Sequence, residues 1–213
     1  MKYKLSDKTK TINGVILFQI IALMDFSDVK SGDFGGWISS EENLSQEGNA
    51  WVCGNAQVYG DARVDGNAQV DGDARVCGDA QVDGDAWVCG NAQVCGNAQV
   101  YGNAQVYGNA RVYGDARVYG DARVCGNAWV YGDARVRNKA IITNNHIINI
   151  AYFKYNITIC DGFVFGGCRD FTHEEFRDLT LAQCTNKTWK QDELDVYKSI
   201  LTLWENIEQH SKK

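Results

Sequence analysis

Residues 48–77 read GNAWVC GNAQVY GDARVD GNAQVD GDARVC, and the same pattern continues to GDARVR at 132–137. These are 15 consecutive hexads of the form G-[ND]-A-x-V-x. Ala and Val stand two positions apart, so in an extended strand they share one face and the variable residues share the other. Gly followed by Asn or Asp is typical of a corner, because these residues tolerate positive φ. Each hexad therefore predicts one short strand and one corner.

Strands of this length cannot keep an apolar face from water on their own, so they must stack on one another. Three hexads make a triangular coil of 18 residues, with Ala and Val inside. The chain has no proline, which fits strands that each donate backbone hydrogen bonds to the next coil. The sequence predicts an all-β solenoid, a triangular parallel β-helix of hexapeptide repeats.

The hexad VYGDAR at 58–63 resembles the motif of the hexapeptide-repeat family, whose members are left-handed β-helices. The resemblance implies the left hand, and a right-handed β-helix is the alternative. The segments at 25–52 and 157–176 are similar to those of uncharacterised phage and prophage hexapeptide-repeat proteins. That similarity implies a cytoplasmic setting in bacteria or in phage-infected cells, and the family implies a homo-oligomer, with a trimer favoured.

Residues outside the repeat are expected to cap its open strand edges. Residues 1–47 predict an N-terminal cap, in which Asn13-Gly14 joins strands at 8–12 and 15–20 as a β-hairpin and further rungs lie at Ile38 and Leu44. The β-helix is expected at 48–149. Residues 150–213 predict a C-terminal cap of a small β-hairpin and two helices, the first starting with the capping box at 172–175.

The second helix is expected to be amphipathic. Its apolar positions are Leu194, Tyr197, Leu201, Trp204 and Ile207.

Net charge is −6 and the pI is near 5.1, which excludes a general binder of nucleic acids or anionic membranes. The apolar run near the N-terminus superficially resembles a signal peptide, but Gln19 interrupts it and Asp25 follows it. No stretch reaches the ~18 apolar residues of a membrane span. We therefore expect a cytoplasmic protein without membrane partners.

Five of the eight cysteines occupy one repeat position that Tyr and Asp also fill, so we interpret them as free thiols. Cys160, Cys168, His173 and Cys184 contain the residue types of a Cys₃His zinc site, but their spacing matches no standard motif. We expect no metal and no cofactor.

An 18-residue period places the outward side chains in columns along three faces. Aromatic and arginine side chains in these columns are typical of binding surfaces, although aromatic ladders also stabilise neighbouring strands. The candidate binding residues are Trp51, Trp87, Tyr101, Tyr107, Arg111, Tyr113, Arg117, Tyr119, Arg123, Trp129, Tyr131 and Arg135.

Hexapeptide-repeat enzymes are mostly acyltransferases, which need a general base, usually histidine. The 15 hexads contain no histidine, and His146 is the one weak candidate near them. We therefore expect a non-enzymatic phage or prophage protein that binds a host protein or a nucleotide-like small molecule and so interferes with host defence. The alternatives are an acyltransferase that uses His146, and a virion or assembly scaffold.

Overall fold

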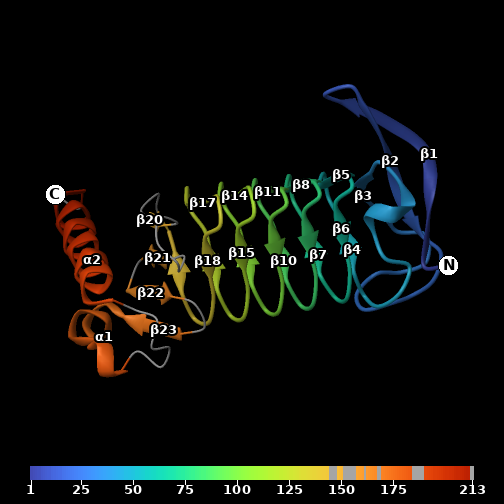
Figure 1. Ribbon diagram of the computed structural model, residues 1–213. Coiled ribbons are helices and arrows are strands. Elements are labelled where there is room, and N and C mark those ends of the chain that lie inside the picture. The colour runs from blue at the N-terminus through green and yellow to red at the C-terminus, as the bar shows by residue number, and fades with distance from the viewer. Residues whose placement is uncertain (144–147, 151–156, 161, 167–168, 184–189, 212–213) are drawn as a thin grey trace. The chain divides into compact units, whose positions relative to one another are not determined.

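The computed structural model describes residues 1–143, 148–150, 157–160, 162–166, 169–183 and 190–211. The chain separates into two compact units, Met1–Asn145 and His146–Lys213. The first unit contains a prism of stacked parallel strands with three faces, and the N-terminal hairpin lies at one end of it (Figure 1). The predicted parallel β-helix of hexapeptide rungs is confirmed.

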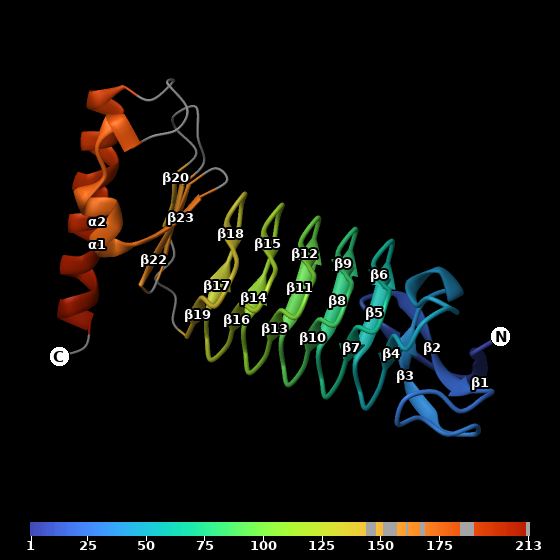
Figure 2. The ribbon, with the colours of Figure 1, turned by 90° about the horizontal axis from the view of Figure 1, so that it is seen from below.

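Face 1 consists of β3 (Phe34–Ile38), β5 (Gln57–Gly60), β8 (Arg75–Gly78), β11 (Gln93–Gly96), β14 (Arg111–Val112) and β17 (Trp129–Val130). Face 2 consists of β4 (Trp51–Val52), β7 (Gln69–Val70), β10 (Trp87–Val88), β13 (Gln105–Val106), β16 (Arg123–Val124) and β19 (Ile141–Ile142). Face 3 consists of β6 (Arg63–Val64), β9 (Gln81–Val82), β12 (Gln99–Val100), β15 (Arg117–Val118) and β18 (Arg135–Val136). Figure 2 shows the coils stacked one on another along the prism.

Neighbouring strands on a face come from positions 18 residues apart, as Val58 pairs with Val76 and Val76 with Val94. Backbone hydrogen bonds run from coil to coil, for example from Cys53 N to Val70 O at 2.9 Å. Every Ala and Val of the 15 hexads lies in the core, with exposure of at most 1%. Each buried Val contributes roughly 1.5–2 kcal/mol of transfer free energy.

The corners depend on glycine. All 15 rung glycines have φ between +61° and +74°, as at Gly54 and Gly96. The coils also approach closely there, since a Cβ on Gly84 would lie 3.0 Å from Gly102 N. In the next rung Asn138 takes the glycine position with φ +59°, and Ile142 is buried after it. The prism therefore continues one rung beyond the regular hexads.

At the other end, Ile38 pairs with Val58 and Leu44 bridges to Val64, which confirms the two predicted early rungs. The hairpin is β1 (Tyr3–Ile12) and β2 (Val15–Ala22), joined at Asn13 and Gly14, and both turn residues have positive φ as expected for a type I′ turn. Strand β2 pairs antiparallel with β3, so the hairpin extends the sheet of face 1.

Side chains supply the hydrogen bonds that a preceding coil would otherwise give. Asn43, at the end of the 3₁₀ turn η1 (Glu41–Asn43), donates from Nδ2 to the carbonyl oxygens of Gly60 and Ala62 at 2.9 and 2.8 Å. Gln46 accepts from Lys2 N at 2.8 Å and donates to Tyr3 O at 3.2 Å. The Asn43 amide thus covers backbone groups at the end of the prism, and the Gln46 amide holds the N-terminal strand against the cap.

Lys2 completes this cap as a buried cation. Its Nζ donates to Ala50 O at 2.8 Å and also reaches the carbonyl oxygens of Glu47 and Gly48. Burial lowers the pKa of Lys2 to about 8, although Asp65 opposes that change. The cap therefore contains an amine whose charged form is costly in the folded state.

The second unit has an antiparallel sheet of β20 (Ile148–Ile150), β21 (Ile157–Cys160), β22 (Phe163–Gly166) and β23 (Arg169–Thr172). It also has α1 (His173–Asp178), the turn η2 (Leu181–Gln183) and α2 (Gln191–Ser211). The predicted capping box is present, because Thr172 Oγ1 accepts from Glu175 N and Glu175 accepts from Thr172 N. The sheet has four strands where the sequence suggested a hairpin.

The core of this unit lies between the sheet and the helices. It is formed by Ile157, Ile159, Val164, Phe176, Leu179, Leu194, Tyr197, Leu201 and Trp204. Four of the five apolar positions predicted for the second helix are thus buried, whereas Ile207 is exposed. Neither described helix is long and apolar enough to cross a bilayer.

The interpretation of all repeat cysteines as free thiols is wrong for one pair. Cys77 and Cys95 occupy the same column on adjacent coils of face 1, with Cα atoms 4.6 Å apart, and form a disulfide. Cys53, Cys89 and Cys125 share a column on face 2, but Asp71 and Tyr107 separate them by one coil each. Two coil rises exceed the Cα separation that a disulfide spans, so these three remain thiols.

We predict that Gly84→Ala destabilises the protein more than Gly14→Ala. Both residues have positive φ, +72° and +82°, so both variants acquire backbone strain. Only at Gly84 would the new Cβ also press against the next coil, because nothing lies within 4 Å at Gly14. We expect a loss of about 2–3 kcal/mol at Gly84 and about 1 kcal/mol at Gly14 in urea unfolding. Equal losses would contradict the close coil contact.

We predict that Cys77→Ser lowers the free energy of unfolding by about 3 kcal/mol under oxidising conditions. The disulfide joins residues that are 18 positions apart, and it therefore closes a loop in the unfolded chain. Urea unfolding with and without a thiol reductant measures this change. The reductant should lower wild-type stability to that of the variant. The matched variant Cys89→Ser, which removes an unpaired thiol, should respond to reductant as wild type does. A wild-type midpoint that ignores the reductant would refute the bond.

We predict that wild type gains stability relative to Lys2→Met when the pH rises from 7 to 10. The folded pKa of Lys2 is about 8, whereas the unfolded chain keeps this proton to about pH 10.4. Between these values the unfolded state binds more protons, so stability rises with pH. Unfolding free energies at pH 7, 8.5 and 10 should show a relative gain of about 1–3 kcal/mol. A difference that stays constant with pH would contradict a buried Lys2 ammonium.

Candidate functional site

The structure places the candidate binding residues on all three faces. Face 1 carries Arg111, Tyr113, Trp129 and Tyr131. Face 2 carries Trp51, Trp87, Tyr107 and Arg123. Face 3 carries Tyr101, Arg117, Tyr119 and Arg135. The candidate binding residues therefore form three separate surfaces, one on each face of the prism.

Several of these side chains contact one another. The Arg111 guanidinium lies 4.9 Å from the Trp129 ring centroid, and the Tyr101 and Tyr119 rings stack at 4.9 Å. Such cross-strand pairs stabilise neighbouring coils. Trp51 is 5% exposed, because Tyr3 and Phe26 of the N-terminal cap pack against its ring. Trp51 is therefore part of the core of the cap.

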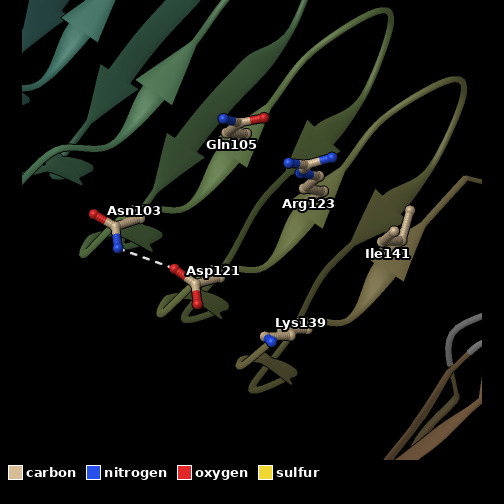
Figure 3. Close-up of a pocket in the computed structure, with 6 residues that line it drawn as sticks. All are labelled: Asn103, Gln105, Asp121, Arg123, Lys139 and Ile141. Carbon is tan, nitrogen blue, oxygen red and sulfur yellow. Dashed lines mark hydrogen bonds between the residues drawn. The ribbon is translucent and has the colours of Figure 1, made fainter.

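One hollow lies along the later coils of face 2 and its adjoining corner (Figure 3). We call it the face-2 groove, and its volume is about 410 Å³. Its lining residues are Asn103, Gln105, Asp121, Arg123, Lys139 and Ile141. Gln105, Arg123 and Ile141 are register partners on three successive strands, and Asn103, Asp121 and Lys139 follow one another down the corner.

The groove combines two cations with amides and one apolar side chain. Asp121 accepts a hydrogen bond from Asn103 Nδ2 at 2.9 Å, which leaves Arg123 and Lys139 as the charged donors that line the rest of the hollow. Figure 3 shows the Arg123, Gln105 and Ile141 side chains on one stretch of the face. Ile141 is 47% exposed. This arrangement suits an elongated ligand with anionic groups and an apolar part.

Sequence reasoning found Arg123 but missed the other residues of the groove. Asn103 and Asp121 belong to Gly-Asn and Gly-Asp corners and were interpreted as turn residues only. Lys139 and Ile141 lie in the rung after the last regular hexad. Extending the 18-residue register by one coil would have placed Lys139 below Asp121 and Ile141 below Arg123.

The second unit has a larger hollow of about 650 Å³ with a different character. Its charged lining is mainly acidic and comprises Arg169, Asp170, Glu174, Glu175 and Asp178. Four carboxylates around one guanidinium disfavour an anionic ligand. The face-2 groove is therefore the better candidate for a site that binds phosphates or carboxylates.

The structure describes the contacts of His173 but not those of His146. His146 lies outside the described residues. His173 Nε2 lies 2.9 Å from the Cys160 carbonyl oxygen and Nδ1 lies 3.2 Å from Glu205 Oε1, while its ring packs edge-on against Trp204. Both ring nitrogens of His173 are thus engaged with acceptors of its own unit, so this side chain joins β21, α1 and α2.

The Cys₃His combination that the sequence analysis judged unlikely to bind zinc lies only partly within the described residues. Cys160 is buried, and its carbonyl oxygen, not its sulfur, lies at hydrogen-bond distance from His173. Cys168 and Cys184 lie outside the described residues. In the part of the chain that the structure describes, no three His, Cys, Asp or Glu side chains gather in a way that could hold a metal ion.

Two thiols of face 2, those of Cys53 and Cys89, are poor nucleophiles. Burial, followed by the nearby Asp71 carboxylate, raises the pKa of Cys53 to about 12. Burial and Asp71 also raise the pKa of Cys89. A thiol reacts through its thiolate, so these cysteines are unsuited to covalent catalysis.

Two comparisons with known proteins bear on function. The YdcK β-solenoid repeat family matches residues 56–72, 92–106, 98–114, 104–120 and 116–132. An uncharacterized acetyltransferase named YdcK from Escherichia coli (strain K12) is 46% identical over 59 residues, 24% of this chain. The match covers 18% of that protein, so the chain spans about a fifth of the length of the curated relative it matches.

These matches overturn the expectation of a non-enzymatic phage or prophage protein that interferes with host defence, because the named relative is an acetyltransferase. They favour the acyltransferase alternative. The absence of histidine from the regular rungs does not exclude catalysis, because these rungs are a scaffold and a base can be supplied from outside them. The parallel coil and the matched segments identify the chain as a hexapeptide-repeat β-solenoid, similar to the repeat of YdcK.

Proposed function

We propose that the protein is an acyltransferase that moves an acetyl group from acetyl coenzyme A to an amine or hydroxyl acceptor. The observation that carries this proposal is the similarity of its rungs to those of a protein named as an acetyltransferase. Four of the matched segments include residues of the face-2 groove, namely 92–106, 98–114, 104–120 and 116–132. The groove is accordingly our candidate for the donor site.

The groove has the groups that such a donor needs. Arg123 and Lys139 would hold the phosphates of coenzyme A, since both are cations that line the hollow. The amides of Asn103 and Gln105 match the amide groups of the pantetheine arm. Ile141 offers an exposed apolar contact to the methylene groups of that arm.

Direct transfer to the acceptor requires a general base and does not require a nucleophile on the protein. The acceptor heteroatom attacks the thioester carbon, the carbon–sulfur bond breaks, and the acceptor proton passes through a base to the coenzyme A thiolate. The raised pKa of Cys53 and of Cys89 argues against either of these thiols as a covalent intermediate. His173 is engaged within its own unit, and of the two remaining histidines we take His146, which follows the rungs in the sequence, as the candidate base.

We predict that the protein releases free coenzyme A from acetyl coenzyme A in the presence of a suitable acceptor, and that His146→Ala lowers kcat/KM by 10²–10⁴-fold. The assay is chromatographic quantification of coenzyme A with a panel of amino sugars, amines and alcohols. His210→Ala, at the end of α2, is the matched control and should retain wild-type rates. Acetyl transfer at the wild-type rate in His146→Ala would remove His146 from the proposal.

The donor site is tested separately by Arg123→Gln combined with Lys139→Gln. Glutamine already occupies the Arg123 register at Gln105, so this variant should fold. We expect KM for acetyl coenzyme A to rise about tenfold or more per lost phosphate contact, with a smaller effect on kcat. If no acceptor in the panel supports transfer and acetyl coenzyme A does not bind the wild type, the proposed function fails.

A further inference from the structure

Gln57 carries a buried hydrogen-bond acceptor on face 1. Its side chain is 7% exposed, and in the part of the chain that the structure describes no group donates a hydrogen bond to its Oε1 atom. A buried polar atom without a partner costs free energy, so it needs a physical explanation. The surroundings of Gln57 are therefore a candidate for a second site, outside the face-2 groove.

Another glutamine of the same column shows how this acceptor is satisfied elsewhere in the repeat. Gln93 lies two coils after Gln57 on face 1, and its Oε1 accepts a hydrogen bond from the hydroxyl group of Tyr113, 20 residues later. The residue 20 positions after Gln57 is Cys77, whose sulfur is bonded to Cys95 and has no proton to donate. The column thus places a disulfide where a tyrosine would have supplied the donor.

Two cations lie on either side of this acceptor. Arg75 is the register partner of Gln57 on β8, and its side chain is exposed. Trp37 is the register partner on β3, and Lys10 of the N-terminal hairpin lies over its ring, with Nζ 4.3 Å from the centroid. The pKa of Lys10 is lowered by burial and then by the charge of Arg75, so the two cations are close in space. Gln57 lies between them.

These cations are only partly neutralised. Neither Lys10 nor Arg75 forms an ion pair with any residue that the structure describes. Asp73 raises the pKa of Lys10, which indicates that its carboxylate is near enough to offset one of the two positive charges. The two cations and this carboxylate together leave one net positive charge beside the buried acceptor.

We propose that Lys10, Trp37, Gln57 and Arg75, the hairpin site, bind a small 2-hydroxycarboxylate. A carboxylate accepts two parallel hydrogen bonds from one guanidinium, and its single charge matches the net charge of the site. A hydroxyl group on the neighbouring carbon supplies the donor that Gln57 Oε1 needs. Adjacent strands lie ~4.8 Å apart, so one such molecule can reach both Gln57 and Arg75.

Other small anions match the hairpin site less well. A carboxylate without the hydroxyl group leaves the Gln57 acceptor unpaired. A phosphate monoester carries a charge of about −1.5 to −2, which exceeds the single net positive charge available. The proposal does not rest on acyl transfer, since the face-2 groove lies on another face of the prism.

The test is a titration of the intact protein at pH 7 with lactate and, separately, with propanoate, followed by ligand-detected NMR. The two acids have the same charge and the same carbon chain, and they differ by the hydroxyl group. Lactate should bind about three- to tenfold more tightly, as expected for one net hydrogen bond to a buried acceptor. Arg75→Gln should weaken both acids about tenfold or more, because a charge-assisted hydrogen bond is lost.

Two further variants separate the roles of the other side chains. Gln57→Leu removes the acceptor from a covered position, so lactate should lose its advantage while the affinity for propanoate stays within about twofold. Lys10→Met keeps an apolar stem over the Trp37 ring but removes the charge, and it should weaken both acids several-fold. Glutamine and leucine suit these positions, since glutamine already occupies the Arg75 register at Gln93 and Gln57 is buried.

The matched control is Arg111→Gln. Arg111 lies in the same column beside Gln93, whose acceptor is already paired with Tyr113, so this variant removes an arginine without changing the hairpin site. It should leave the affinity for lactate within about twofold of wild type.

The proposed site fails if wild type binds lactate and propanoate equally, or if Gln57→Leu keeps the preference for lactate. It also fails if Arg111→Gln weakens lactate as much as Arg75→Gln does, because the attraction would then be non-specific. Inorganic phosphate that binds more tightly than lactate at the same pH would contradict the match to a single negative charge.

Discussion

The prism depends on one backbone constraint, namely that each strand must place its N–H and C=O groups opposite those of the coil above and the coil below. Strands of two to four residues have almost no other stabilisation of their own. The corners must therefore return the chain to the same register every 18 residues, and the left-handed φ of residues such as Gly84 makes that return possible. The close approach of Gly84 to Gly102 follows from the same geometry. Buried Ala and Val then fill the space that the corners enclose.

Sequence reasoning recovered this part of the fold because the constraint repeats. A pattern found 15 times leaves one consistent interpretation of which residues face inward, and the inward positions were all correct. The pairing of Cys77 with Cys95 was implicit in the same register, since residues 18 apart must lie on neighbouring strands. It was missed because the cysteines were assigned to one shared repeat position, and the two that lie on adjacent coils were not distinguished from the others. Asn138 shows a further limit, because a rung can continue when a different residue adopts the glycine conformation.

The cap and the groove could not be predicted in the same way, because each is made of contacts that occur once. Nothing in the local sequence indicates that Lys2 will donate to the carbonyl oxygen of Ala50, 48 residues away. The groove arises where the regular pattern gives way to Lys139 and Ile141, and only the coil register connects these residues with Arg123. A long-range polar contact is specified by the folded coil and not by a motif, so it becomes visible only once the coil is built.

A scaffold of this kind separates stability from function unusually well. Its inward residues are nearly invariant along the chain, and its outward positions accept Gln, Arg, Trp, Tyr, Cys or Asp without change of backbone. Outward residues that merely tolerate solvent need no particular order. An order that costs free energy therefore indicates selection for something other than folding. The adjacent Arg117 and Arg135 do not meet that criterion by themselves, because Arg135 has a further interaction that can offset their repulsion. The same reasoning does not single out the stacked Tyr101 and Tyr119, whose contact stabilises the coils by itself.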